Sequence, residues 1–200
     1  MSKMAKAMSK DRITSPSAES LAASARAAQG KGLPPVDEWN PPFMGDLDIR
    51  ITRDGKWYHE GGEITRPGLV RLFSTILKRE GDRFYLITPV EKVGITVDDA
   101  PFVAVDVEAE GDDNDQELIF ETNVGDKVVA GDDNPIRVER DPHTGEPSPY
   151  VMIRSGLEAL IDRKSFYRLI EHGTRQDGWF GLWSGGVFFK VIPDDELPAE

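Results

Sequence analysis

The segment FYLITPVEKVGI (residues 84–95) places a carboxylate beside an ammonium group, Glu91 and Lys92, inside an otherwise apolar stretch. A desolvated lysine can serve as a Schiff-base or general-base residue, but a neighbouring carboxylate keeps the ammonium charged. Pro89 has no backbone N–H to donate to a strand ladder, so PVEK is interpreted as the connection between two strands over residues 84–88 and 93–97. We therefore expect a charged turn that also forms one wall of a binding site.

Two arginines, Arg66 and Arg163, each lie in the first turn of a predicted helix. A cation at this position opposes the helix dipole at a cost of about 0.3–1 kcal/mol. The favoured interpretation is a salt bridge to a nearby carboxylate, and the alternative is an anion held jointly by the guanidinium and the helix N–H groups. Arg71 and Arg168 are interpreted as solvated positions.

The sequence contains few motifs that would indicate a metal site or an enzyme. Asp46 and Asp48 share a strand face and could hold a divalent cation, but a solvated strand face collects the same residues. The sequence has no cysteine, no Gly-rich phosphate loop ending in Lys-Ser/Thr and no second histidine after HEGGE. We predict no catalytic residue, no metal site and no cofactor. Trp57, Trp179 and Trp183 are interpreted as small-core residues, with stacking on a planar ligand as the alternative.

Composition and charge exclude some classes of function. The chain of 200 residues is 38% hydrophobic and 30% charged, with a net charge of −12, and residues 105–141 hold thirteen acids against three bases. Binding a nucleic-acid polymer requires clustered Lys and Arg, so we do not expect it. No apolar run approaches the roughly 18–20 residues that span a bilayer, and the N-terminus lacks the pattern of a secretory signal. We expect no membrane association and a cytoplasmic location.

The pattern along the chain predicts two α+β domains. Residues 1–38 are predicted to be a disordered tail with a Pro-rich lead-in, because residues 1–32 have almost no large apolar side chains. Residues 39–98 form the first domain, with alternating strand residues from 46 to 51, an Asp-Gly turn, and a helix over 65–81 that Thr65 caps. Residues 99–195 form the second domain, with a helix capped by Asp162 and a closing hairpin, and residues 196–200 are a tail.

An internal similarity supports a duplication. A shift of 97 residues places ITRPGLVRLF (64–73) over IDRKSFYRLI (161–170), and a two-strand segment follows each helix. One helix on a small sheet buries only one face of each element, so two such units side by side would create a seam. Seams between similar domains are common ligand sites.

The strings TPVEK, DAPFVAV and WSGGVFF, within a match from about Trp39 to Ile192, resemble the bacterial family called domain of unknown function 1285. The resemblance implies a cytoplasmic protein of two duplicated α+β domains, each a curved mixed or antiparallel sheet with one main helix. It also implies that the second domain is loosely similar to pleckstrin-homology folds. A further implication is an interdomain ligand site, for a nucleotide-like molecule in a signalling context. The matching residues nearest such a site would be Arg66, Thr88, Glu91, Lys92, Arg154, Trp183, Ser184 and Gly185.

The leading hypothesis is a noncatalytic sensor or adaptor that binds a small anionic ligand, with Lys92 and Arg66 neutralising its charge and a Trp stacking on it. One alternative is an enzyme of unknown reaction that uses Glu91 or Asp48 as base. Another is a protein-interaction module without a small ligand, whose partner the sequence does not identify.

Overall fold

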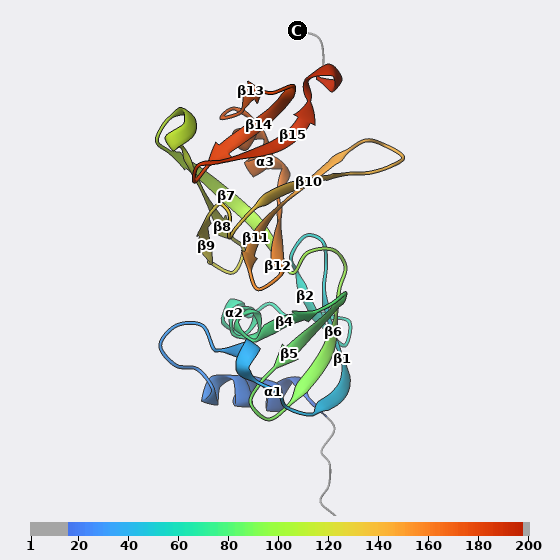
Figure 1. The fold of residues 1–200 in the computed structure, drawn as a ribbon. Coiled ribbons are helices and arrows are strands. Elements are labelled where there is room, and N and C mark those ends of the chain that lie inside the picture. Colours follow the sequence, from blue (N-terminus) through green and yellow to red (C-terminus); the bar gives the residue numbers. More distant parts are fainter. Residues whose placement is uncertain (1–15, 198–200) are drawn as a thin grey trace, which may run out of the picture.

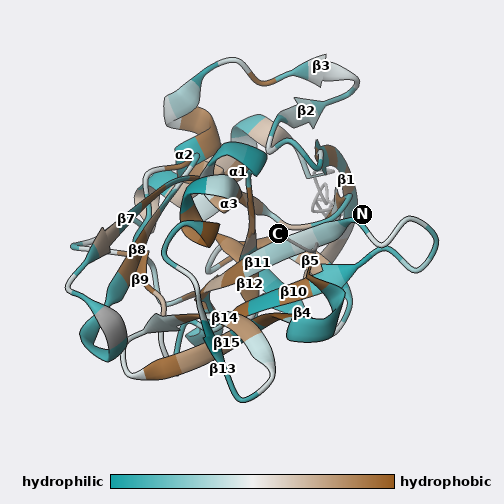
Figure 2. Cartoon of the chain, turned by 90° about the horizontal axis from the view of Figure 1, so that it is seen from above, coloured by the Kyte–Doolittle hydropathy of each residue, from teal (hydrophilic) through white to brown (hydrophobic). Residues whose placement is uncertain are grey.

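A computed structural model describes residues 16–197, apart from the side chain of residue 113, and places two α+β domains end to end (Figure 1). The fold class predicted from the sequence, α+β with two domains, is confirmed. In Figure 2, hydrophobic residues lie along the strands of the sheets, whereas the peripheral loops are mostly hydrophilic. Within the described residues, no helix is long and apolar enough to cross a membrane.

The first domain is built on a six-stranded sheet with the strand order β3-β2-β1-β6-β5-β4. Its outer strands run antiparallel to their neighbours, and the central pair β1–β6 is parallel. The strands are β1 Phe43–Ile51, β2 Trp57–His59, β3 Gly62–Glu63, β4 Leu77–Glu80, β5 Arg83–Ile87 and β6 Lys92–Val97.

Strand β1 follows the predicted alternation. Asp46, Asp48 and Arg50 are exposed on one face, whereas Ile49 and Ile51 are buried on the other. A strand projects successive side chains to opposite faces, so the sequence pattern alone gives the orientation of this strand.

Helix α2, Pro67–Thr75, is shorter than predicted, because residues 77–80 form strand β4 and pair with β5. The Ser74 and Thr75 hydroxyls donate to the carbonyls three residues earlier, each at 2.7 Å, and a β-branched residue, Ile76, follows. These features compete with helix continuation. The predicted cap is also wrong, because Arg66 and not Thr65 is the N-cap, without a side-chain hydrogen bond.

The prediction of a disordered tail is wrong for helix α1, Ala18–Ala27, and the prediction for residues 1–15 lies outside the described residues. Ser17 and Ser20 form a capping box at the start of α1. Leu21 and Ala25 are fully buried and belong to the same core cluster as Leu72 of α2. One leucine and a stripe of alanines are therefore enough to hold α1 in place, because they pack against a core that other segments form.

The second domain contains a curved six-stranded sheet, one helix and a separate three-stranded sheet. The first sheet has the order β10-β11-β12-β7-β8-β9, with β12 and β7 parallel. Its elements are β7 Phe102–Glu110, β8 Glu117–Thr122, β9 Lys127–Val129, β10 Ile136–Arg140, β11 Pro147–Arg154, β12 Leu157–Ile161 and α3 Arg163–Ile170. The third sheet has β13 Thr174–Gln176, β14 Trp179–Ser184 and β15 Val187–Pro193, and 3-10 turns occupy Val36–Glu38 (η1), Asp113–Asp115 (η2) and Asp194–Glu196 (η3).

Both domains follow their helix with three antiparallel strands, β4–β5–β6 after α2 and β13–β14–β15 after α3. In the first domain these strands join the main sheet through the parallel β1–β6 pair. In the second domain they form their own sheet. The predicted Asp162 cap of α3 is confirmed, since its carboxylate accepts a hydrogen bond from the Ser165 N–H at 2.7 Å.

Candidate functional site

An open cleft of about 740 Å³ lies between the two domains. The β1–β2 turn, the β3–α2 segment and the first turns of α2 line it from the first domain, and β7 and the β8–β9 turn line it from the second. Its volume falls within the roughly 300–1,000 Å³ that small-molecule sites occupy. The lining residues are Gly55, Lys56, Trp57, Glu63, Ile64, Thr65, Pro67, Gly68, Val70, Arg71, Val105, Glu121, Thr122, Asn123, Val124 and Gly125.

The domains are in close contact at Gly55 in the β1–β2 turn. A side chain there would lie 2.7 Å from Asn123 Nδ2 and 2.9 Å from Val103, and the φ angle of +80° also favours glycine. The Asn123 amide bridges the domains by donating to the Gly55 carbonyl at 3.2 Å and accepting from the Val103 N–H at 3.1 Å. At this side of the cleft, side chains of the second domain therefore lie directly against the backbone of the first.

Arg71 of α2 crosses the cleft toward the β8–β9 turn. A Cβ atom built on Gly125 would lie 3.1 Å from Arg71 Nη2, so the absence of a side chain at Gly125 admits the guanidinium. Arg71 is exposed and has no carboxylate within 4.0 Å among the described side chains. Most described arginines are paired with an acid, and those that are not are Arg26, Arg66, Arg71 and Arg79.

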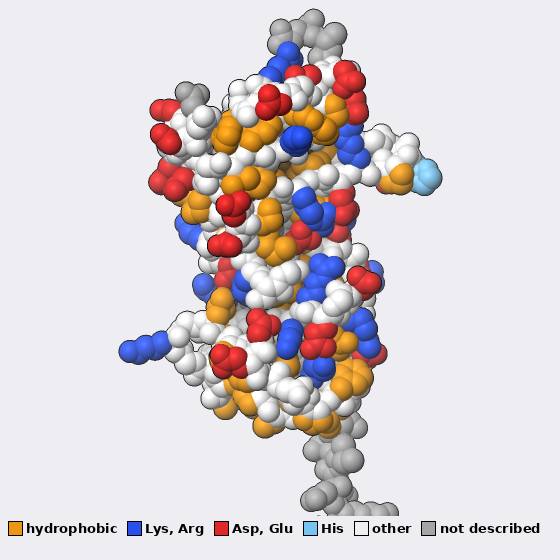
Figure 3. All heavy atoms as spheres, in the orientation of Figure 1, with side chains coloured by type: hydrophobic (Ala, Val, Ile, Leu, Met, Phe, Trp, Pro, Cys, Tyr) orange, Lys and Arg blue, Asp and Glu red, His pale blue; other side chains and the backbone are white. Residues whose placement is uncertain are grey.

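Of the other three charged groups of the cleft, Lys56 and Glu121 have partners and Glu63 has none among the described side chains. Lys56 lies 3.8 Å from an Asp54 carboxylate oxygen, and Glu121 pairs with Lys127 at 3.0 Å. Glu63 is exposed on β3. Figure 3 shows basic and acidic side chains intermixed where the domains meet, and a group of acidic side chains on one edge of the second domain. The cleft lining holds two cations, Lys56 and Arg71, and two acids, Glu63 and Glu121.

The start of α2 adds one backbone donor to the same region. Pro67 has no N–H, and the Leu69 and Val70 N–H groups donate to the Arg66 carbonyl at 3.0 and 3.2 Å. Since Arg66 supplies no side-chain cap, the Gly68 N–H has no acceptor among the described residues. Pro67 and Gly68 line the cleft, and a Cβ atom built on Gly68 would meet nothing within 4 Å. The first turn of α2 is therefore open to a ligand that occupies the cleft.

Arg154 joins the domains directly behind the cleft. Its Nη2 donates to the Ser74 carbonyl of α2 at 2.8 Å, its Nη1 forms an ion pair with Asp126, and its guanidinium lies 4.9 Å from the centroid of the Phe102 ring. Ser74 lies one turn after Arg71, and Asp126 follows Gly125. Arg154 therefore holds α2 against the same β8–β9 turn that Arg71 faces.

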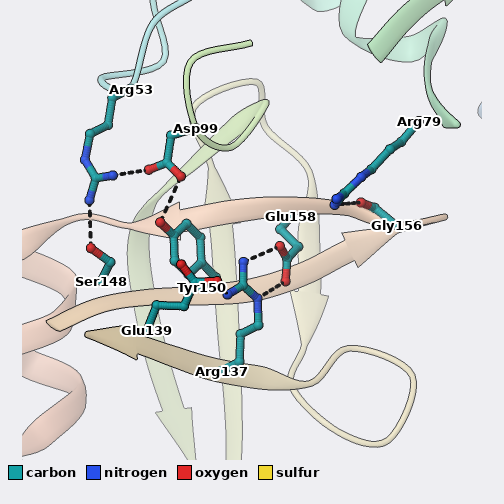
Figure 4. Close-up of polar contacts among 9 residues, drawn as sticks. All are labelled: Arg53, Arg79, Asp99, Arg137, Glu139, Ser148, Tyr150, Gly156 and Glu158. Carbon is teal, nitrogen blue, oxygen red and sulfur yellow. Dashed lines mark hydrogen bonds and ion pairs between the residues drawn. The ribbon is translucent and has the colours of Figure 1, made fainter. Parts of the chain in front are cut away.

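A second polar contact between the domains is shown in Figure 4. Arg53 forms an ion pair with Asp99 and donates to the Ser148 hydroxyl at 2.9 Å, and the Tyr150 hydroxyl donates to Asp99 at 2.8 Å. Burial, and then the bond to Asp99, raises the pKa of Tyr150 above its ordinary value of 10.0. Together with the bond from Arg79 to the Gly156 carbonyl, these contacts keep the cleft preformed.

The structure does not bring the eight residues named from the sequence together. Arg66 lies in the chain between two lining residues, Thr65 and Pro67, but is not itself a lining residue, and Arg154 contacts the last turn of α2. Thr88, Glu91 and Lys92 lie at the β5–β6 turn, the end of β6 that is far from the second domain. The two acids considered as bases, Asp48 and Glu91, do not line the cleft.

Thr88 and Lys92 have local partners in the β5–β6 turn. The buried Thr88 hydroxyl accepts the Glu91 N–H at 3.2 Å and so shapes the turn. Lys92 pairs with Glu80 at 2.9 Å, and its ammonium lies 4.8 Å from the centroid of the Tyr85 ring. Lys92 is thus already neutralised.

Trp183, Ser184 and Gly185 attach the β14–β15 hairpin to the start of β8, at the opposite end of β8 from the cleft. The Ser184 hydroxyl donates to the Ala130 carbonyl at 2.7 Å and accepts the Leu118 N–H at 2.8 Å. The Trp183 carbonyl accepts the side-chain amide of Gln116 at 2.8 Å, and the Gly185 N–H donates to the Gln116 carbonyl at 3.1 Å. These contacts give the three residues a structural role.

Replacing Glu91 by glutamine should raise the free energy of unfolding slightly at neutral pH, by a few tenths of a kcal/mol. Partial burial raises the pKa of Glu91, and a hydrogen bond with Ser24 of α1 only partly opposes this. A raised folded-state pKa contributes stability below the ordinary value of about 4.5, and this contribution is lost as the pH rises through the folded-state pKa. Urea unfolding at pH 4 and pH 7 should show the gain at pH 7 only, and an equal gain at both would contradict this account.

Arg71, Lys56 and Gly125 are cleft residues that sequence reasoning did not select. Arg71 is on the solvated side of the helical wheel. The sequence around Gly125, NVGD (residues 123–126), gives no sign that it contacts Arg71. The signal that could have helped is that residues 64–79, which include Arg66 and Arg71, contain no acid, although the whole chain has a net charge of −12.

Comparison with known proteins places both domains in one family. Residues 34–100 match the family described as "Domain of unknown function (DUF1285), N-terminal domain", and residues 101–191 match "Protein of unknown function (DUF1285), C-terminal domain". No curated protein matches the chain.

Two solved structures are similar to the chain. A DUF1285 family protein from Silicibacter pomeroyi DSS-3 is 65% identical, with a TM-score of 0.83, over 88% of this chain and 96% of that one. A DUF1285 family protein from Shewanella baltica OS155 is 27% identical, with a TM-score of 0.50, over 62% of this chain and 90% of that one. The resemblance noted from TPVEK, DAPFVAV and WSGGVFF is thereby confirmed, and the chain belongs to the DUF1285 family.

Proposed function

We propose that this protein is a noncatalytic sensor or adaptor that binds a small anionic ligand in the interdomain cleft. The observation that carries the proposal is that Arg71, which lines the cleft from α2, has no carboxylate within 4.0 Å among the described side chains. Arg66, the N-cap of the same helix, has none either. The chain has 36 acids and only 24 bases, so acidic partners are plentiful elsewhere. An arginine without an acid is suited to a phosphate or a carboxylate, which it binds bidentately.

The mixed lining of the cleft favours a ligand of the nucleotide type over a bare inorganic anion. Its polar side offers Arg71 and the open first turn of α2, and its apolar side offers Ile64, Val70 and Val105. A phosphate at the arginine would leave a base or another flat apolar group against the aliphatic side chains. Trp57 supports this wall from beneath, because it is only 1% exposed and packs against Phe73.

The rival functions have less support. An enzyme that uses Asp48 or Glu91 would place its base outside the cleft, and no specific contact favours a protein-interaction module. Lys92 is no longer proposed as a ligand residue, because Glu80 neutralises it. A cytoplasmic location stays a prediction.

The test is thermal stabilisation by adenine and guanine mono-, di- and triphosphates, with inorganic phosphate and pyrophosphate as comparison anions. At least one nucleotide at 1 mM should raise the melting temperature, and Arg71→Gln should weaken its affinity by about tenfold or more, since a charge-assisted bond contributes roughly 1.5–3 kcal/mol. The matched control is Arg50→Gln, an exposed arginine that pairs with Asp98 outside the cleft. No shift with any anion, or equal affinity in the Arg71 variant, would overturn the proposal.

A further inference from the structure

A second cavity, of about 380 Å³, lies in the second domain and does not belong to the interdomain cleft. Helix α3, the loop end of the β10–β11 hairpin, strands β14 and β15 and the turn η3 line it. Its apolar lining consists mainly of Phe166, Ile170, Phe180, Val191, Ile192 and Leu197.

These apolar side chains are only partly buried. Each one leaves carbon surface facing the cavity or solvent, although the core of the same domain buries Leu169 and Leu182 completely. Contiguous apolar surface of this kind marks a binding site more often than a packing fault. A ligand for this cavity must therefore be mainly hydrocarbon.

One cation defines the polar end of the cavity. Arg140, at the end of β10, lines it and forms an ion pair with Glu196 of η3. The side chains of Arg140 and Glu196 are 35% and 51% exposed, so the pair lies at the solvent-facing rim. The next residue, Leu197, lines the apolar part.

The turn η3 and the residue after it thus supply two groups to the cavity. The Glu196 carboxylate pairs with Arg140, and the adjacent Leu197 contributes a branched alkyl group to the lining. We propose that the cavity binds a medium-chain aliphatic carboxylate, with the head group on Arg140 and the chain among Phe166, Ile170 and Phe180. In this arrangement Glu196 and Leu197 act as a built-in competitor that the ligand displaces. The proposal does not depend on the function proposed for the interdomain cleft.

The competitor arrangement predicts opposite effects for the two members of one ion pair. Glu196→Gln frees Arg140 and should tighten binding of octanoate and decanoate about fivefold, whereas Arg140→Gln should weaken it about tenfold or more. An ion pair with only a structural role would instead give both variants the same effect. Isothermal titration of the full chain at pH 8, where the fatty acids are ionised, measures both affinities.

Chain length tests the hydrocarbon part. From hexanoate to octanoate and decanoate, affinity should rise about fifteenfold for each added pair of methylene groups, because each buried methylene contributes about fourfold. Decanol lacks the carboxylate and should bind at least tenfold more weakly than decanoate. The matched controls are Asp98→Asn and Arg50→Gln, an ion pair in the first domain that should leave decanoate binding unchanged.

Equal effects of Glu196→Gln and Arg140→Gln, equal binding of decanol and decanoate, or affinities independent of chain length would each overturn the proposal. Loss of decanoate binding in Arg71→Gln would also overturn it, because that result would place the fatty acid in the interdomain cleft.

Discussion

Replacing Phe73 by alanine should lower the free energy of unfolding by about 3–5 kcal/mol, as is usual for a buried phenylalanine in a close-packed core. Phe73 is fully buried in α2, and its ring stacks on the indole of Trp57 at 6.2 Å between centroids. Trp57 lines the interdomain cleft, so the cavity left by Phe73→Ala would lie directly beneath the proposed ligand. Anion binding should weaken even at temperatures where the variant is still folded.

Urea unfolding followed by tryptophan fluorescence measures this loss. Leu69→Ala is the matched control, because Leu69 lies on the same helix and is only partly buried, and it should cost about half as much. A loss below about 1.5 kcal/mol for Phe73→Ala would show that α2 does not carry the core of the first domain.

Replacing Arg154 by methionine should lower the free energy of unfolding by about 2–3 kcal/mol. The substitution leaves Asp126 without its cation and the Ser74 carbonyl without its donor. Breaking a fully buried pair costs roughly 3–5 kcal/mol, but here the two side chains keep 19% and 26% exposure, which reduces the penalty. The loss should appear at the domain junction first, as faster amide exchange in α2 and the β8–β9 turn.

A double-mutant cycle with Asp126→Asn isolates the ion pair from the contact with Ser74. The two losses should be clearly less than additive, with a coupling of about 1–2 kcal/mol. Arg163→Met is the control, because the Arg163–Glu146 pair is 77% and 66% exposed and such pairs contribute about 0–1 kcal/mol. Additive losses for Arg154 and Asp126 would mean that the pair does not hold the domains together.

These two predictions concern the same property of the cleft. Phe73 supports its floor, and Arg154 fixes the distance between α2 and the β8–β9 turn. A site whose walls are fixed in this way loses little conformational entropy when a ligand binds. The proposed anion site should therefore respond to changes at Phe73 and Arg154, although neither residue would contact the ligand.

Local pattern was enough to predict several elements. The alternation of Asp46, Asp48 and Arg50 with Ile49 and Ile51 gave the orientation of β1, and Asp162 marked the start of α3. The strings TPVEK, DAPFVAV and WSGGVFF indicated the family, and the repeated helix motif indicated two α+β domains. Each of these inferences uses residues that are neighbours in the chain. The alternation of side chains along a strand and the preference for certain residues at the start of a helix are local properties, so they can be recognised in the sequence.

Tertiary structure decided the end of α2, the packing of α1 and the place of every candidate ligand residue. Residues 77–80 continue the apolar and charged pattern of a helix, yet β4 forms because β5 offers it a hydrogen-bonding edge. Arg71, Arg50 and Arg163 are all exposed arginines, but Arg71 faces a glycine turn, whereas Arg50 and Arg163 each face a carboxylate. The charge, exposure and spacing of a residue can be inferred from the sequence, but its partner across a domain interface depends on the long-range pairs β1–β6 and β12–β7, which only the folded chain brings together.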